Sequence, residues 1–184
     1  MEPYLASSVH VAGFVTAAKR LGLLEKVLPL LASVTRHVLD HPFDEKWVHA
    51  DVIQDLTRRT AEAHGPEVLE TINFEMTKNS LGKLVLPMLR VALAITGGSP
   101  ATVFARLSDS MKVAMKGVKV TWLADGANRG RITLNYPEAP PPVIHHAWRG
   151  VFRFAFELTA REGRLVEHRY LDGGKTVELD VAWT

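Results

Sequence analysis

The sequence predicts an α+β fold, in which an N-terminal helical layer packs on a four-stranded, mostly antiparallel sheet. Three features of the hydrophobic pattern predict it. Apolar residues recur every three to four positions between residues 9 and 116, which is typical of amphipathic helices. From Val118 onward the period falls to two in four short segments, as in half-buried strands. Residues 143–160 return to helical spacing and separate these strands into two pairs, so the C-terminal part has a ββαββ order.

The first helices follow one another closely. Residues 9–21 and residues 23–39 keep the spacing of amphipathic helices, and Pro29 is expected to kink the second helix or delay its start. Pro42 ends this helix, because the residue before a proline avoids the α conformation. A third helix is expected to run from residue 43 or 44 to residue 64.

The longest apolar stretch lies in the middle of the chain. Pro66 opens a segment that reaches Ile95 as one helix, or as two helices with a break near Gly82, and that is expected to be the most buried. Ser99-Pro100 then supplies the N-cap and the first position of a helix over residues 101–116. No strand is therefore expected before residue 117.

The four strands are expected to form two hairpins. Val118–Trp122 pairs with Ile132–Tyr136 around a turn rich in glycine, aspartate and asparagine. Residues 164–171 pair with residues 176–183, where apolar and polar residues alternate without a slip. One face of the sheet is therefore expected to be buried and the other to face water.

Length and composition limit the possible classes of protein. The chain has 184 residues, which suits a single domain with a helical part at 1–116 and a ββαββ part at 117–184. The absence of cysteine excludes disulfides, thiolate metal sites and a cysteine nucleophile. Lysine and arginine number 22 against 20 acidic residues, so no nucleic-acid partner is expected.

The sequence also bears on location. The N-terminus is acidic and the segment after it is interrupted by His10 and Lys19, so a secretory signal is not expected. The longest apolar run contains Pro87 and Arg90 and is too short to cross a bilayer. A cytoplasmic protein without a membrane span is expected.

Motifs for catalysis and metal binding are weak. The sequence contains no Gly-x-Ser-x-Gly elbow, phosphate loop or dinucleotide fingerprint. His37 and His41 lack the glutamate of a zinc-protease motif, and no metal site is expected. His145 and His146 open the predicted helix at 143–160, with rings expected to point about 100° apart. They would support an enzyme only if a carboxylate from a neighbouring element joined them.

Aromatic and methionine side chains suggest a ligand pocket between the helices and the sheet. The candidate ligand-binding residues are Phe74, Met88, Met111, Trp122, Trp148 and Phe152. Two alternatives remain open: the same residues also suit a packed core, and an exposed face with Trp148, Phe154 and Phe156 would suit a homodimer or another protein partner.

The order of elements and several local features carry a family resemblance. The local features are Trp47 after the break at Pro42, Phe74–Leu89 running into Ala92–Thr96, Gly97-Gly98-Ser99-Pro100, Asn128 in the first hairpin, Gly150 in the proline-led helix, and the terminal Val181-Ala182-Trp183. With them the chain resembles the haem-NO-binding-like superfamily, which includes haem sensors, the 4-vinyl-reductase type of ligand-binding domain and the small TRAPP subunits. It looks most like an uncharacterised bacterial family of unknown function within that group. The resemblance implies a cavity between helices and sheet, or a dimer surface on the same elements.

The departures from the haem sensors concern the haem itself. Those sensors carry a proximal histidine on a helix ahead of the sheet and a Tyr-x-Ser-x-Arg motif for the propionates. Residues 100–116 contain no histidine, and Tyr136-Pro137-Glu138-Ala139-Pro140 lacks the serine and the arginine. No cofactor is therefore expected. The leading hypothesis is a non-enzymatic module that binds a small apolar ligand or acts as a sensor; the alternatives are a dimerising adaptor and, third, an enzyme using His145 or His146.

Overall fold

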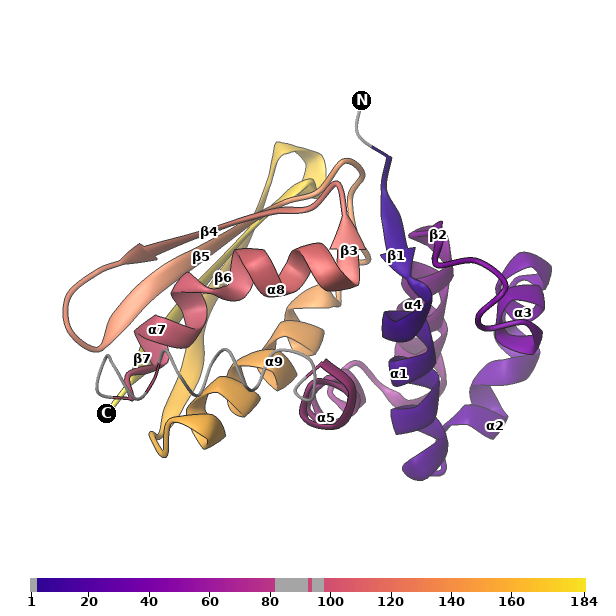
Figure 1. The fold of residues 1–184 in the computed structure, drawn as a ribbon, viewed down its shortest axis with the longest axis horizontal. Helices are drawn as coiled ribbons and strands as arrows, with labels where there is room; N and C mark the ends of the chain where they lie inside the picture. The colour runs from indigo at the N-terminus through magenta and orange to yellow at the C-terminus, as the bar shows by residue number, and fades with distance from the viewer. Residues whose placement is uncertain (1–2, 82–92, 94–97) are drawn as a thin grey trace.

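A four-stranded antiparallel sheet forms one side of the molecule in the computed structural model, which describes residues 3–81, 93 and 98–184 (Figure 1). The strands have the order β4-β5-β7-β6. Their bounds are Lys119–Ala124 for β4, Arg129–Asn135 for β5, Gly163–Leu171 for β6 and Thr176–Trp183 for β7. Every second residue of β7 is buried. The two predicted hairpins are thus confirmed. Alternation holds in β5 and β7, because a period of two over seven or eight residues specifies which face is buried, whereas β6 does not alternate and its pairing with β7 shifts register between Leu165 and Glu167.

Three helices cover the buried face of this sheet. They are α7 (Pro100–Ala105), α8 (Leu107–Ala114) and α9 (Ile144–Leu158). The first two pack on β4 and the third on β6 (Figure 1). As predicted, the Ser99 side chain accepts a hydrogen bond from the Ala101 amide, and Pro100 takes the first helical position.

The N-terminal helices form the other side of the molecule (Figure 1). They are α1 (Ser8–Arg20), α2 (Leu24–Val27), the 3₁₀ turn η1 (Leu28–Leu30), α3 (Ser33–Asp40) and α4 (Asp51–His64). The predicted helix over residues 23–39 is therefore broken in two. Pro29 lies in η1, and the extended Ala32 after it donates its amide hydrogen to the Asp55 carboxylate at 2.9 Å. The hydrophobic pattern of the sequence continues through this break. The Ala32 amide is satisfied by the Asp55 side chain of α4, which is distant in the sequence.

A second, three-stranded sheet was not expected. Its strands are β1 (Leu5–Ser7), β2 (Trp47–His49) and β3 (Met115–Lys116), in the order β2-β1-β3. The predictions of a helix starting at Phe43 or Asp44, and of no strand before residue 117, are wrong. Strands of two or three residues are too short to show a period, and their partners lie far apart in the sequence.

Helix α5 (Val68–Met76) lies between α1 and α9 and continues into a π-helical turn, η2 (Thr77–Leu81) (Figure 1). A Cβ atom on Gly150 of α9 would lie 2.2 Å from the Glu70 carbonyl oxygen and 2.6 Å from the Phe74 amide nitrogen. Glycine is therefore what lets the two helices approach so closely. Most of the predicted central helix, including the expected break near Gly82, lies outside the described residues.

Within the described ranges, no helix combines the length and the apolar character that a bilayer span requires.

Candidate ligand-binding site

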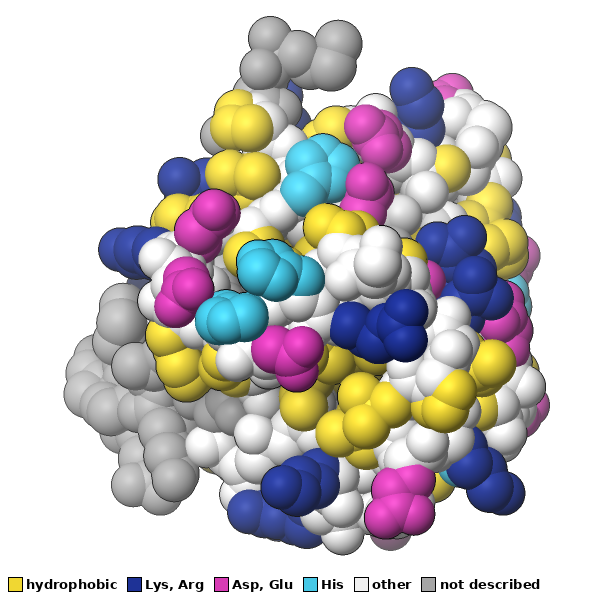
Figure 2. Space-filling model, turned by 90° about the vertical axis from the view of Figure 1, so that its right-hand side faces the viewer, with side chains coloured by type: hydrophobic (Ala, Val, Ile, Leu, Met, Phe, Trp, Pro, Cys, Tyr) yellow, Lys and Arg dark blue, Asp and Glu magenta, His cyan; other side chains and the backbone are white. Residues whose placement is uncertain are grey.

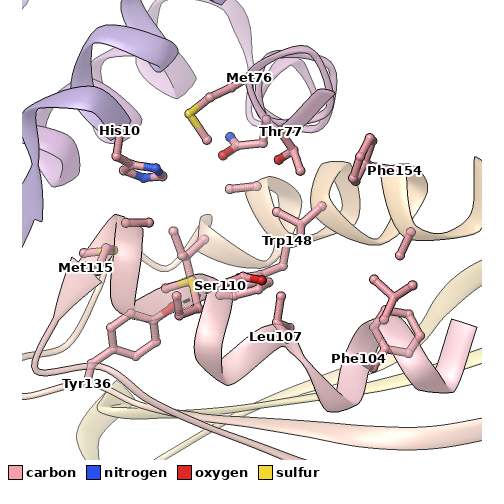
Figure 3. Close-up of a pocket in the computed structure, with 18 residues that line it drawn as sticks. His10, Met76, Thr77, Phe104, Leu107, Ser110, Met115, Tyr136, Trp148 and Phe154 are labelled. Carbon is pink, nitrogen blue, oxygen red and sulfur yellow. Dashed lines mark hydrogen bonds between the residues drawn. The ribbon is translucent and has the colours of Figure 1, made fainter. Parts of the chain in front are cut away.

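A cavity of about 120 Å³ lies where α1, α5, α8 and α9 meet (Figure 3). Cavities of about 150 Å³ can hold a benzene-sized ring, so this space suits one small ring and little more. Most of its wall is apolar. The larger apolar side chains in the wall include Met76, Phe104, Leu107, Met111, Trp148 and Phe154.

His10 reaches this cavity from the first turn of α1 (Figure 3). Its position follows from local structure, because Ser7 ends β1 and also caps α1 by accepting a hydrogen bond from the His10 amide at 3.2 Å. The Nδ1 atom of His10 is enclosed and has no hydrogen-bond partner in the described protein. Burial lowers the pKa of His10 to about 4. At neutral pH the ring is therefore uncharged and offers one donor and one acceptor.

Thr77 of η2 brings a second buried polar atom to the same cavity (Figure 3). It is 8% exposed, and its hydroxyl oxygen has no partner among the described residues. Buried threonines in helices usually donate to the carbonyl four residues earlier, as Thr57 does to Ile53 at 2.8 Å. Thr77 departs from this pattern where α5 turns into η2.

Tyr136 and Trp148 form a fixed part of the wall. The Trp148 indole N–H donates to the Tyr136 hydroxyl oxygen at 3.0 Å, and both side chains are buried. Burial also raises the pKa of Tyr136, so the phenol stays uncharged. With its N–H paired, Trp148 presents apolar ring surface to the cavity.

The structure brings two of the six predicted ligand-binding residues together, because Met111 of α8 and Trp148 of α9 both line the cavity. Phe152 lies one turn further along α9 and is buried in the core. Its ring packs edge-on against Phe104 at 5.6 Å and lies 5.9 Å from Trp148. Phe152 therefore supports the wall from behind.

The other three predicted residues lie elsewhere. Trp122 packs on the rings of Phe104 and Trp183, on the sheet side of the core. Phe74 faces away from the cavity, and the guanidinium of Arg153 lies 4.3 Å from its ring centre. Met88 lies outside the described residues.

Sequence reasoning missed His10 and Thr77. The available clue was a polar residue inside an otherwise apolar helical segment. That clue is ambiguous, because such a residue is often paired inside the core, as Thr57 is.

The paired histidines at the start of α9 form a surface cluster. The ring of His145 lies 4.1 Å from that of His146 and stacks on that of His168 at 3.8 Å. Its Nδ1 atom lies 2.9 Å from the Tyr170 hydroxyl. Burial, and then the neighbouring imidazoles, lower the pKa of His145 to about 4. In the described parts of the chain no carboxylate hydrogen-bonds to this cluster, and no group of three histidine or acidic side chains is placed to hold a metal ion.

The apolar face that would suit a dimer is not found on α9. Trp148 and Phe156 are each only 5% exposed, and Phe154 lines the cavity. Exposed apolar residues are instead scattered, with Val34 and Phe43 on the N-terminal side and Leu123 and Val166 on the strands of the larger sheet. On the N-terminal side of the molecule hydrophobic side chains lie among charged and histidine side chains (Figure 2).

Comparison with known proteins places this fold. A family described as protein of unknown function (DUF2378) matches residues 73–184, which is more than half of the chain. The chain belongs to this family. No curated protein matches it. The family match confirms the predicted resemblance to a family of unknown function.

Several solved structures share the fold over nearly the whole chain. The unliganded Fe(II) H-NOX protein from K. algicida has a TM-score of 0.68 at 12% identity, covering 97% of this chain and 96% of that one. A Cs H-NOX variant gives 0.60 at 10% identity, covering 97% and 96%. A Tt H-NOX variant gives 0.57 at 12% identity, covering 97% and 95%. At such low identity the likeness establishes the fold alone.

Because this fold is that of H-NOX proteins, the cavity can be compared with what haem requires. Helices α7 and α8 carry no histidine, and no lysine or arginine is among the described residues that line the cavity, so propionates would have no cationic partner. A space of about 120 Å³ suits one small ring, whereas a porphyrin joins four pyrrole rings in a macrocycle. The residues described here do not fit haem.

Proposed function

We propose that this protein is a sensory or regulatory module that binds a small, largely apolar molecule in the cavity between α1, α5, α8 and α9. The observation that carries the proposal is an apolar cavity of about 120 Å³ into which two buried and unpartnered polar groups project. Pockets that bind small molecules typically combine an apolar wall with a few well-placed polar groups.

The wall is suited to adapt to a ligand. Three methionines, Met76, Met111 and Met115, contribute to it, and their unbranched side chains fill irregular gaps at low cost. The fixed pair of Tyr136 and Trp148 gives the opposite behaviour, a rigid surface on which a ring can pack. A small ring therefore meets both a shaped surface and an adjustable one.

The position of the cavity suits a sensor. Its wall joins α1 of the N-terminal side to α8 and α9, which cover the sheet. A molecule bound there contacts both sides at once. If the two sides have two relative arrangements, the ligand shifts the equilibrium between them by the difference between its affinities for the two.

Binding can be tested with toluene, a probe of suitable size, by following the thermal unfolding midpoint and ligand-observed NMR. We expect toluene to raise the midpoint in the unaltered protein, because a ligand that binds only the folded state stabilises it by mass action. Ala147→Leu adds bulk to the cavity wall and should abolish the effect.

The matched control is Ala105→Leu, the same change at an exposed position of α7, which should leave the toluene effect intact. Failure of the unaltered protein to bind either toluene or phenol would refute the proposed function. Native mass spectrometry of the purified protein adds an independent readout, since a bound small molecule would appear as an added mass.

A further inference from the structure

We propose that the ligand of this cavity carries a hydroxyl group on a small ring, and that the hydroxyl binds between His10 and Thr77. This inference rests on the proposed function and adds the chemical class of the ligand. It starts from the distribution of polar groups in the wall. Figure 3 shows His10 and Thr77 projecting into the same space, from α1 and from η2, while Phe104, Leu107 and Phe154 close the other end.

The two side chains offer complementary hydrogen bonds. In the proposed site the proton of the uncharged His10 ring is on Nε2, which leaves Nδ1 as an acceptor, and the described protein supplies no partner for Nδ1. The Thr77 hydroxyl is unpartnered and can donate. A ligand hydroxyl satisfies both at once, because its hydrogen goes to the imidazole and its oxygen accepts from Thr77. An ether or a ketone lacks the donor, and a methyl group lacks both.

The charges of the residues that line the cavity narrow the chemical class of the ligand further. No lysine or arginine is among the described residues lining the cavity, and the imidazole of His10 is uncharged at neutral pH. A buried carboxylate would therefore have no counter-charge, which is strongly unfavourable. Acidic side chains are likewise not found among the described residues of the wall, so an ammonium group has no partner either. The ligand that fits is neutral.

Binding of three probes of similar size tests the inference: phenol, toluene and benzoate, titrated at pH 7 by calorimetry or ligand-observed NMR. We expect phenol and toluene to bind and benzoate not to bind. Thr77→Val removes the hydroxyl and keeps the shape of the side chain. It should lower the affinity for phenol at least tenfold and change the affinity for toluene by no more than about threefold. His10→Leu should act in the same direction.

A matched control lies in the same wall. Ser110 also lines the cavity, but its hydroxyl already lies 3.2 Å from the Arg106 carbonyl oxygen, to which it donates. Ser110→Ala should therefore leave the affinity for phenol unchanged. Thermal unfolding of each ligand-free variant shows that it is folded. Thr77→Val should unfold at the same or a higher temperature than the unaltered protein, since it removes a buried hydroxyl without a partner.

The outcomes separate the two proposals. If Thr77→Val lowers the affinities for phenol and toluene equally, or lowers neither, the hydroxyl assignment is overturned. Binding of toluene to the unaltered protein would still support the cavity as a ligand site. Tight binding of benzoate would overturn the assignment of a neutral ligand. Failure of phenol and toluene alike to bind the unaltered protein would overturn both this inference and the proposed function.

Discussion

At the scale of single residues, this protein retains polar groups that its own core does not satisfy. A buried donor or acceptor without a partner costs about 1–3 kcal/mol, and most native buried groups avoid that cost. His10 and Thr77 both lack partners in the described protein and both face the same cavity. Under the proposed function, this cost is the stability that the protein gives up at the cavity for binding.

The buried histidine makes stability depend on pH. In the unfolded chain His10 takes up a proton below about pH 6.5, whereas in the folded protein its pKa is about 4. Between these values the unfolded state binds more protons, so stability falls as the pH drops from 6.5 towards 4. We expect His10 to account for about 2 kcal/mol of the loss between pH 7 and pH 5, at about 1.4 kcal/mol per pKa unit.

Urea unfolding at pH 7 and pH 5 measures this loss. His145 shifts in the same direction, so some pH dependence should remain when His10 is replaced. His10→Leu should reduce the difference between the two pH values. An undiminished difference in that variant would mean that His10 is protonated as easily in the folded protein as in the unfolded chain.

At the scale of elements, α9 is the helix on which the site depends. It lines the cavity on one side, and its Gly150 contacts the backbone of α5. Gly150→Ala should destabilise the protein by about 1–3 kcal/mol, because the added methyl group would overlap the Glu70 carbonyl oxygen and the helices must separate. The sign of the effect is informative, since Gly→Ala in an uncrowded helix stabilises by about 0.5–1 kcal/mol.

Chemical unfolding of Gly150→Ala therefore decides whether α5 and α9 are as close in solution as in the structure. A gain in stability would show that they are not. Toluene or phenol affinity should fall in the same variant, because α5 and the turn after it hold Met76 and Thr77 against the cavity.

The elements that sequence patterns predicted well are those whose own residues determine them. The eight residues of β7 alternate throughout, and Ser99-Pro100 forms a cap from adjacent positions. Strands β1, β2 and β3 were missed because each is three residues or fewer and exists only through distant pairing. In the candidate site, too, some residues follow from the local sequence pattern and others only from contacts in space. Met111 and Trp148 follow from an apolar pattern, whereas the role of His10 depends on which groups surround it in space.

At the scale of the whole molecule, the chain keeps the fold of H-NOX proteins with a cavity that does not fit haem. Among the described residues of the N-terminal helices, His10 of α1 alone lines the cavity, and the helices that cover the sheet supply much of the remaining wall. Under the proposed function, a bound ligand acts on how the two sides are held together through this contact. Fold and ligand chemistry are separable, because the ligand is selected by a few side chains on the fold.

Hydrogen exchange tests whether the two sides respond together. Phenol at about one hundred times its dissociation constant should stabilise the folded state by about 2.7 kcal/mol. Amide exchange should then slow in α1 and in α8, which contribute to the cavity from the two sides, and should not change at the exposed turn between β4 and β5. Ala147→Leu provides the control, since phenol should slow no exchange when the cavity is filled. Slowing confined to α8 and α9 would show that the ligand contacts only the sheet side, and the proposed coupling between the two sides would then be wrong.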